Sequence, residues 1–276
     1  MDFEFFATPP SPRLAPFIEI IWAVRGATDY VVEAIPPNGA IELMINFGPT
    51  QKVLAYGEQR VDQNFERFWV AGLQERSLTI ASPHGCDHMG VRFKPGGAHA
   101  FFELPMHDVS NQVIDLDLLL GASAAAELYE RLSLATSHAA RCALIEHWLL
   151  TRRYAVHPYY ATTRKAIDIL QSSGFRVSVN ELCYRLGLSN RHLIEQFRRV
   201  VGVTPKSLSR ITRFNSVVRA IRHDDDPAWP ALAYRFNFAD QAHLVREFKH
   251  YSGVTPMEFV ANRSPDHAHV VVDAAY

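Results

Sequence analysis

The sequence has few cysteines, and they form no recognisable pattern. They are Cys86, Cys142 and Cys183. Because the count is odd and no two lie in a CxxC pair, a disulfide framework is not expected. No run of about 20 apolar residues is present, which excludes an ordinary membrane-spanning helix. The first residues, MDFEFFATPP, lack the basic and apolar regions of a signal peptide. We therefore expect a cytoplasmic protein that does not contact a membrane.

Enzyme signatures are also missing. The sequence contains no GxSxG, P-loop, GxGxxG or HExxH motif. The Gly96-Gly97 turn lacks the strand-to-helix context and the Lys-Ser/Thr pair that phosphate binding requires. We expect neither an enzyme nor a bound cofactor.

The chain has almost no net charge, but its basic and acidic residues are unevenly distributed. The chain of 276 residues carries a net charge of −1. Residues 151–276 hold 18 Lys and Arg against 11 Asp and Glu, whereas residues 1–150 hold 10 against 18. A basic half beside an acidic half favours one domain that meets phosphate and another that does not. The length also favours two domains.

The C-terminal half contains an internal repeat. Residues 182–208 read LCYRLGLSNRHLIEQFRRVVGVTPKSL, and residues 232–259 read LAYRFNFADQAHLVREFKHYSGVTPMEF. The offset changes from 50 to 51 positions between the first leucines and the histidines His192 and His243, so the second copy has one inserted residue at about Ala239. Such self-similarity indicates one supersecondary unit used twice.

Each copy has the pattern of a helix, a tight turn and a second helix. In the first copy Gly187 is expected at positive φ and Ser189 is expected to cap the second helix. In the second copy Asn237 and Asp240 take these places. The apolar residues of each second helix recur on one side, as Leu193, Phe197 and Val200 and as Leu244 and Phe248. Both copies end in Gly-Val-Thr-Pro, in which threonine caps the next helix and proline begins it.

Two short helices with this turn predict a helix-turn-helix, whose second helix enters the major groove of DNA. The duplication, and above all FADQAHLVREFKHYSGVTP at residues 238–256, resembles the AraC/XylS family of transcription regulators. The resemblance covers about residues 155–263. It implies two helix-turn-helix motifs joined by a long helix, expected here at residues 205–222.

The first half shows short β-type runs separated by turn residues. We expect strands at residues 17–24, 30–34, 41–47, 68–71, 78–81 and 88–93, and helices at 98–103, 123–134 and 138–152. The predicted fold class is α+β, with an N-terminal small β-barrel or sandwich with helices and a C-terminal all-α domain. The expected domains are 1–153 for sensing and dimerisation, 158–263 for DNA binding, and a loosely ordered tail at 264–276. Residues 152–158 are the expected linker.

The predicted DNA contacts lie opposite the buried side of each second helix. Arg191, Arg246 and Gln241 are the best candidates to read bases, and Arg198 and Lys249 suit phosphate contacts. Glu195 repels phosphate, so the first copy is expected to read few bases, or only particular ones. The complete set is Asn190, Arg191, Ile194, Glu195, Arg198, Gln241, Ala242, Val245, Arg246 and Lys249.

Two smaller features are a recurring Tyr-Arg pair, which has two interpretations, and an acidic loop, which has one. A Tyr-Arg pair recurs as Tyr184-Arg185 and Tyr234-Arg235, and either contacts the DNA backbone or packs against the turn. In the loop 223–226, Asp226 is expected to cap a helix that starts at Pro227.

One stretch leaves an alternative function open. Residues 82–88, SPHGCDH, place His84, Cys86, Asp87 and His88 close together, which could hold a metal but with irregular spacing. The alternatives are therefore a small-barrel enzyme or metal-responsive protein with a DNA-binding appendage, or a DNA-repair methyl acceptor that uses Cys86. The favoured partners are double-stranded DNA and a small-molecule effector, and the resemblance also implies a homodimer and contact with RNA polymerase.

Overall fold

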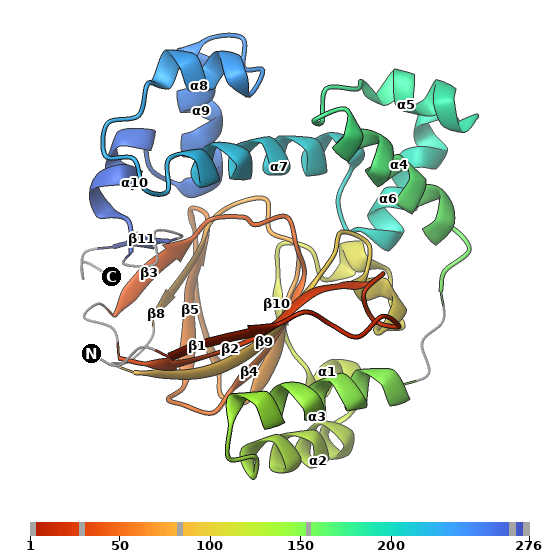
Figure 1. The fold of residues 1–276 in the computed structure, drawn as a ribbon, viewed down its shortest axis with the longest axis vertical. Coiled ribbons are helices and arrows are strands. Elements are labelled where there is room, and N and C mark those ends of the chain that lie inside the picture. Colours follow the sequence, from red (N-terminus) through yellow and green to blue (C-terminus); the bar gives the residue numbers. More distant parts are fainter. Residues whose placement is uncertain (1–3, 28–30, 82–84, 153–155, 265–268, 273–276) are drawn as a thin grey trace.

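A computed structural model describes residues 4–27, 31–81, 85–152, 156–264 and 269–272. A β-rich N-terminal half is followed by a helical C-terminal half (Figure 1). This is the α+β architecture that the sequence predicts. No helix among these residues is long and apolar enough to cross a membrane.

The N-terminal half is built from two antiparallel sheets, which together we call the barrel. Their strand orders are β1-β2-β9-β4-β7-β10 and β11-β3-β8-β5-β6. The strands are β1 (Glu4–Thr8), β2 (Ile18–Gly26), β3 (Val32–Ile35), β4 (Glu42–Asn46), β5 (Gln51–Tyr56), β6 (Gln59–Phe65), β7 (Phe68–Ala71), β8 (Leu78–Ala81), β9 (Cys86–Phe93), β10 (Val113–Asp115) and β11 (Val270–Val271).

The two faces of the larger sheet differ. Ile21, Leu43, Ile45, Met89 and Val91 alternate along three neighbouring strands and are fully buried, as expected for a face that packs against helices. That cover comes from α1 (Asp117–Leu120), α2 (Ala122–Ser133) and α3 (His138–Thr151), which lie beside the barrel (Figure 1).

The C-terminal half contains seven helices among the described residues. Helix α7 crosses above the barrel and joins the two helical groups (Figure 1). At its middle, Gly39 of the barrel approaches Ile211 and Asn215. The helices are α4 (Tyr160–Ser172), α5 (Val179–Leu186), α6 (Asn190–Val200), α7 (Pro205–Ala220), α8 (Trp229–Arg235), α9 (Gln241–Ser252) and α10 (Pro256–Asn262).

The six expected strands are present, but several elements were not expected. These are β1, the β5–β6 hairpin, β10, β11 and α1. The helix expected at 98–103 is only a 3-10 turn, Ala98–Ala100. The predicted cap at Asp226 is wrong, because α8 begins at Trp229 with Ala228 before it and no side-chain cap. Of the expected linker, residues 153–155 lie outside the described part of the chain.

The expectation of a loosely ordered tail is wrong for residues 269–272. Strand β11 pairs with β3 in antiparallel register, Val270 opposite Ala34 and Val271 opposite Glu33. His269 Nδ1 lies 2.8 Å from Glu33 Oε2. The chain that follows the last helix is therefore part of the barrel's smaller sheet at residues 270–271.

Candidate nucleic-acid interface

The two motifs, α5–α6 and α8–α9, have matching turns. Gly187 has φ 66° and Asn237 has φ 58°, which confirms the left-handed turn residue in each copy. Ser189 Oγ accepts a hydrogen bond from His192 N at 3.2 Å, and Asp240 Oδ1 accepts one from His243 N at 2.6 Å. Both predicted caps are thus confirmed, and each fixes the first turn of a second helix.

The buried side of each second helix also follows the sequence pattern. Leu193, Phe197 and Val200 of α6 are buried, as are Leu244 and Phe248 of α9. Their burial determines which residues face outward, because an α-helix places positions 3, 4 and 7 apart on one side.

The predicted contact residues lie on the opposite side. Ile194 and Val245 are half-buried and the others are exposed. The exposed ones are Asn190, Arg191, Glu195 and Arg198 on α6, and Gln241, Ala242, Arg246 and Lys249 on α9. We call these ten residues the reading faces. Because the copies are offset by 51 positions, the two reading faces occupy equivalent positions of equivalent helices.

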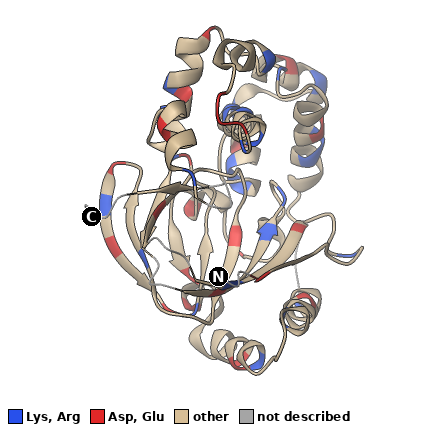
Figure 2. Cartoon of the chain, turned by 60° about the vertical axis from the view of Figure 1, so that its left-hand side comes forward, with Lys and Arg blue, Asp and Glu red and all other residues tan. Residues whose placement is uncertain are grey.

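The two reading faces differ in charge. Arg246 and Lys249 stand on α9, whereas α6 combines Arg191 and Arg198 with Glu195. Glu195 occupies the position equivalent to Arg246. Lys and Arg are found on most helices of the C-terminal half, interspersed with Asp and Glu (Figure 2). Such a surface can attract a polyanion, more strongly at the second motif.

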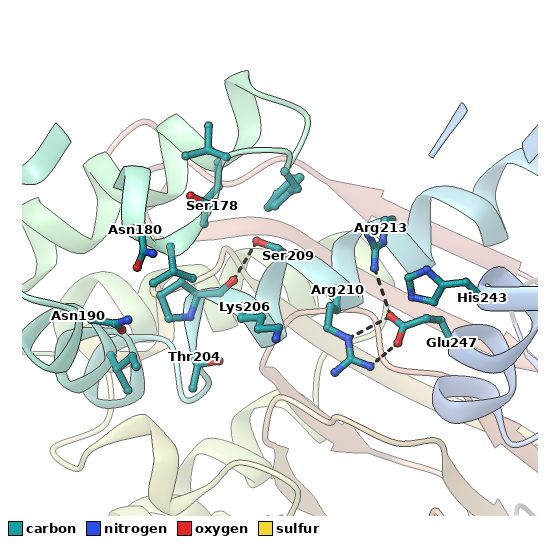
Figure 3. A pocket seen from close by; sticks show the side chains of 16 residues that line it. Ser178, Asn180, Asn190, Thr204, Lys206, Ser209, Arg210, Arg213, His243 and Glu247 are labelled. Atoms are coloured by element: carbon teal, nitrogen blue, oxygen red, sulfur yellow. Dashed lines mark hydrogen bonds and ion pairs between the residues drawn. The ribbon is translucent and has the colours of Figure 1, made fainter. Parts of the chain in front are cut away.

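A groove of about 860 Å³ runs along α7 between the two motifs (Figure 3). Asn190 of the first reading face lies at one end, and His243 and Glu247 of α9 lie at the other; Ile194 also lines the groove. The polar residues on its floor are Thr204, Lys206, Ser209, Arg210 and Arg213.

At the second motif Glu247 ties α9 to α7. Arg210 Nε donates to Glu247 Oε2 at 3.0 Å and a second Arg210 nitrogen contacts Oε1, while Arg213 lies 3.3 Å from Oε2. Burial alone would raise the pKa of Glu247, but the hydrogen bonds and charges of the two arginines hold it below its usual value. Hydrogen bonding to Glu247 likewise raises the pKa of Arg210.

Sequence reasoning missed this ion-pair cluster. Arg210 and Arg213 are three positions apart on the expected long helix and therefore share a face. Glu247 stands on the buried side of α9 beside Phe248. A carboxylate on an otherwise apolar helix face requires a buried partner, and that was the available signal.

The recurring tyrosines do not pack against the turns. Tyr184 is 85% exposed and Tyr234 is 89% exposed. Both tyrosine side chains are therefore available to a partner. Arg235, by contrast, lies over the ring of Phe236 in the turn of the second motif, with its guanidinium carbon 5.1 Å from the ring centroid, as the packing interpretation expects. Arg235 and Tyr234 line a second, smaller hollow with Arg176 and Asn237.

The described part of the SPHGCDH stretch, residues 85–88, includes side chains that are used for structure. Asp87 pairs with Arg141 at 2.5 Å and with Arg25 at 3.2 Å. Burial lowers the pKa of His88 to about 4. Burial also raises the pKa of Cys86, with Asp87 and Glu33 adding to the shift, which opposes an activated thiolate. Among the described residues no group of three His, Cys, Asp or Glu could hold a metal; His84 lies outside them.

Two known sequence families match the chain. Residues 7–115 match a domain of unknown function (DUF6597), and residues 182–262 match a helix-turn-helix domain. A search of curated proteins gave no match.

Among solved structures, ToxT from Vibrio cholerae has 10% sequence identity and a TM-score of 0.49, covering 95% of this chain and 98% of that one. The structure of its apo K231A variant has 9% sequence identity and a TM-score of 0.49, and the match covers 87% of this chain and 97% of that one. The AraC-like transcriptional activator CuxR has 13% sequence identity and a TM-score of 0.23, and the match covers 78% of this chain and 86% of that one.

The family match at residues 182–262 coincides with the two helix-turn-helix motifs of the structure, and an N-terminal barrel precedes them. The chain therefore carries a helix-turn-helix domain of the kind that the resemblance to AraC/XylS regulators predicts.

Proposed function

We propose that α6 and α9 enter two consecutive major grooves on one side of a DNA duplex. The observation that carries this is the exposure of equivalent reading faces on both helices. Helix α7 has 16 residues, which makes it about 24 Å long. A helix of this length holds the two motifs apart, and the proposal requires α6 and α9 to be about 34 Å apart, one turn of DNA.

Each part of the reading faces has a proposed role. Arg191 and Arg246 can each donate two hydrogen bonds to guanine, and Gln241 can pair with adenine. Glu195 can accept from cytosine N4, and Ile194 can pack on a thymine methyl group. Arg198 and Lys249, one turn further along, are suited to phosphate contacts that position the protein. Asn190, Ala242 and Val245 complete the two faces.

We propose that the barrel controls DNA binding by taking up a small molecule. Trp22 and His88 point to the same side of the larger sheet, because Trp22 pairs with Gly90 and His88 lies two residues before Gly90. Trp22 Nε1 and His88 Nε2 are buried without a hydrogen-bond partner among the described residues. A buried polar group without a hydrogen-bond partner destabilises the folded protein. A bound effector that hydrogen-bonds to Trp22 and His88 would remove this destabilisation.

The proposed domains are 1–153 for sensing and dimerisation, 158–263 for DNA binding, and 264–276 as a C-terminal tail that returns to the barrel. Leu118 and Leu134, near the helix pair α2–α3, are 80% and 81% exposed. Exposed leucines there support a homodimer formed through these helices. Contact with RNA polymerase is part of the same proposal. Sedimentation at several concentrations tests the dimer.

The test of DNA reading uses duplexes selected by the protein from a random-sequence pool. Affinity should fall steeply with salt, by a log–log slope of about 0.9 for each phosphate contact. Arg246→Ala should cost about 1–3 kcal/mol of binding and relax the preference at one base pair.

The matched control is Arg219→Ala. Arg219 is exposed in the last turn of α7 and is not one of the ten reading-face residues, so both the affinity and the preferred sequence should persist. A slope near zero for the wild-type protein, or an unchanged base preference in Arg246→Ala, would contradict the proposal.

A further inference from the structure

The barrel contacts the C-terminal end of α6. We call α6 and α9, the second helices of the two motifs, the first and second recognition helices. Ser110 Oγ donates to the carbonyl of Gly202 at 3.0 Å. His107 Nδ1 lies 3.3 Å from the carbonyl oxygen of Arg198. A Cβ on Gly202 would lie only 2.4 Å from Ser110 Oγ, so the two segments are in close contact. The Arg198 carbonyl lies in the last turn of α6, where a helix presents unpaired acceptors, and Gly202 follows just beyond the end of the helix.

The barrel also contacts the second recognition helix, α9, near its C-terminal end. Arg76 donates to the carbonyl of His250 at 3.1 Å. Gly253 stands 51 positions after Gly202, and a Cβ there would lie 3.4 Å from Ser77 Oγ. A cationic side chain is favourable here because the C-terminal end of a helix carries partial negative charge. Each recognition helix is therefore contacted near its C-terminal end by a nitrogen of a barrel side chain, and a barrel serine lies beside the glycine at or just beyond that end.

The two gripping segments, residues 72–77 and 106–112, are joined to each other, and we call them together the bracket. Gly72 N donates to the Gln112 carbonyl at 3.0 Å, and Asn111 N donates to the Leu73 carbonyl at 3.0 Å. Glu75 N donates to Asn111 Oδ1 at 2.7 Å. A Cβ on Gly72 would meet Val109 O at 1.6 Å, so the segments pack backbone to backbone. These hydrogen bonds and contacts make the bracket one structural unit.

We infer that the bracket sets the distance and angle between the two recognition helices, with Arg76 and Ser110 as positioning residues for DNA reading. The inference rests on the proposed two-groove function. The bracket touches the C-terminal ends of α6 and α9, while the reading faces other than Ile194 and Val245 stay exposed. It can therefore fix geometry without covering the surface that meets DNA. DNA offers consecutive major grooves at a fixed repeat, so a fixed helix separation selects a fixed spacing between two half-sites.

The test measures spacing preference. Two boxes enriched by the wild-type protein from a random-sequence pool are placed in duplexes whose separation is changed one base pair at a time. The wild-type protein should lose about tenfold or more in affinity when the optimal spacing changes by one base pair. Arg76→Ala combined with Ser110→Ala should reduce this penalty to about twofold while retaining the same two boxes. Arg76→Lys, which keeps a cation, should retain most of the preference.

The control is Arg67→Ala, which removes a partly exposed barrel arginine that pairs with Asp117 away from the bracket. It should leave the spacing profile unchanged. A role in stability alone would weaken binding equally at every spacing. If the double variant keeps the wild-type profile, the bracket inference is wrong. If the wild-type protein itself shows no spacing preference, the proposed two-groove function is wrong instead.

Discussion

In the second motif, α9 is tied to α7 through Glu247, which is 8% exposed and paired with Arg210 and Arg213. At the equivalent position of the first motif, α6 carries Gln196, which is 3% exposed. Gln196 Oε1 is buried without a hydrogen-bond partner among the described residues. The first motif packs its second helix against α4 instead.

This difference shows that one helix-turn-helix backbone can be secured in two ways. Apolar packing holds α6, whereas a buried ion-pair cluster adds a directional link at α9. The second reading face should therefore be the more firmly oriented one, and it also carries the greater positive charge. Exchanging features between the motifs tests this comparison.

The largest effect should come from giving the first motif the acidic residue of the second. Gln196→Glu would bury a carboxylate where no ion pair awaits it, which should cost about 3 kcal/mol of folding stability. Urea unfolding measures the change. Gln196→Met, of similar volume, is the control and should be far less costly. A loss below about 1 kcal/mol for Gln196→Glu would show that α6 can also accept a charge.

The reverse exchange should have the next largest effect. Glu247→Gln leaves Arg210 and Arg213 without their carboxylate, which should lower the free energy of unfolding by about 2 kcal/mol. The loss is smaller than for a fully buried pair because both arginines are partly exposed. Glu181→Gln, which removes an exposed pair with Arg185, should cost about 0.5 kcal/mol or less. Equal losses in these two variants would argue against a special role for the cluster.

Acid should weaken the second motif in the same direction, but by less than the substitution. The pKa of Glu247 is lower in the folded protein than its usual value of 4.5. The stabilisation is therefore present above pH 4.5 and is lost as the pH falls through the lower folded value. Hydrogen exchange of α9 amides should accelerate before that of α6 amides on acidification. Simultaneous acceleration would contradict the comparison.

A smaller effect is expected at the turns. Gly187→Ala should cost about 1 kcal/mol, because φ of 66° is unfavourable for alanine although the added Cβ meets nothing within 4 Å. Gly187→Asn copies the second motif and should cost less. Thermal unfolding of both variants measures this, and equal losses would mean that the turn requires glycine for another reason.

The smallest effect should come from exchanging a charge on the reading face. Glu195→Arg gives the first motif the residue that the second has at Arg246. On a duplex of unrelated sequence, where no base is read, it should strengthen binding by about 0.5 kcal/mol because a cation near phosphate replaces an anion. The log–log salt slope should also steepen by about one phosphate contact. Unchanged or weaker binding to this duplex would mean that residue 195 lies away from the phosphates.

Local patterns in the sequence predict much of this molecule. The repeat, its caps at Ser189 and Asp240, and the turn residues Gly187 and Asn237 follow from short-range rules, because each side chain acts within four residues of its own position. The six central strands were predictable from their apolar residues for a similar reason.

Features that depend on distant partners were not predictable. Strand β6 reads QRVDQNF and has an exposed, polar pattern, so it becomes a strand only by pairing with β5. Strand β11 likewise depends on β3. The Glu247 cluster and the bracket join residues far apart in sequence, and a single sequence gives their composition without their contacts. The base and phosphate roles of the reading faces remain predictions.

The most direct test of the central claim is a footprint of the full-length protein on its selected duplex, read as guanine N7 methylation interference in the major groove. Two reading faces on one side predict two interference clusters about 10 base pairs apart, on the same face of the duplex. The Arg246→Ala variant should lose interference at a single guanine of one cluster. One cluster alone, or two clusters on opposite faces of the helix, would contradict the account.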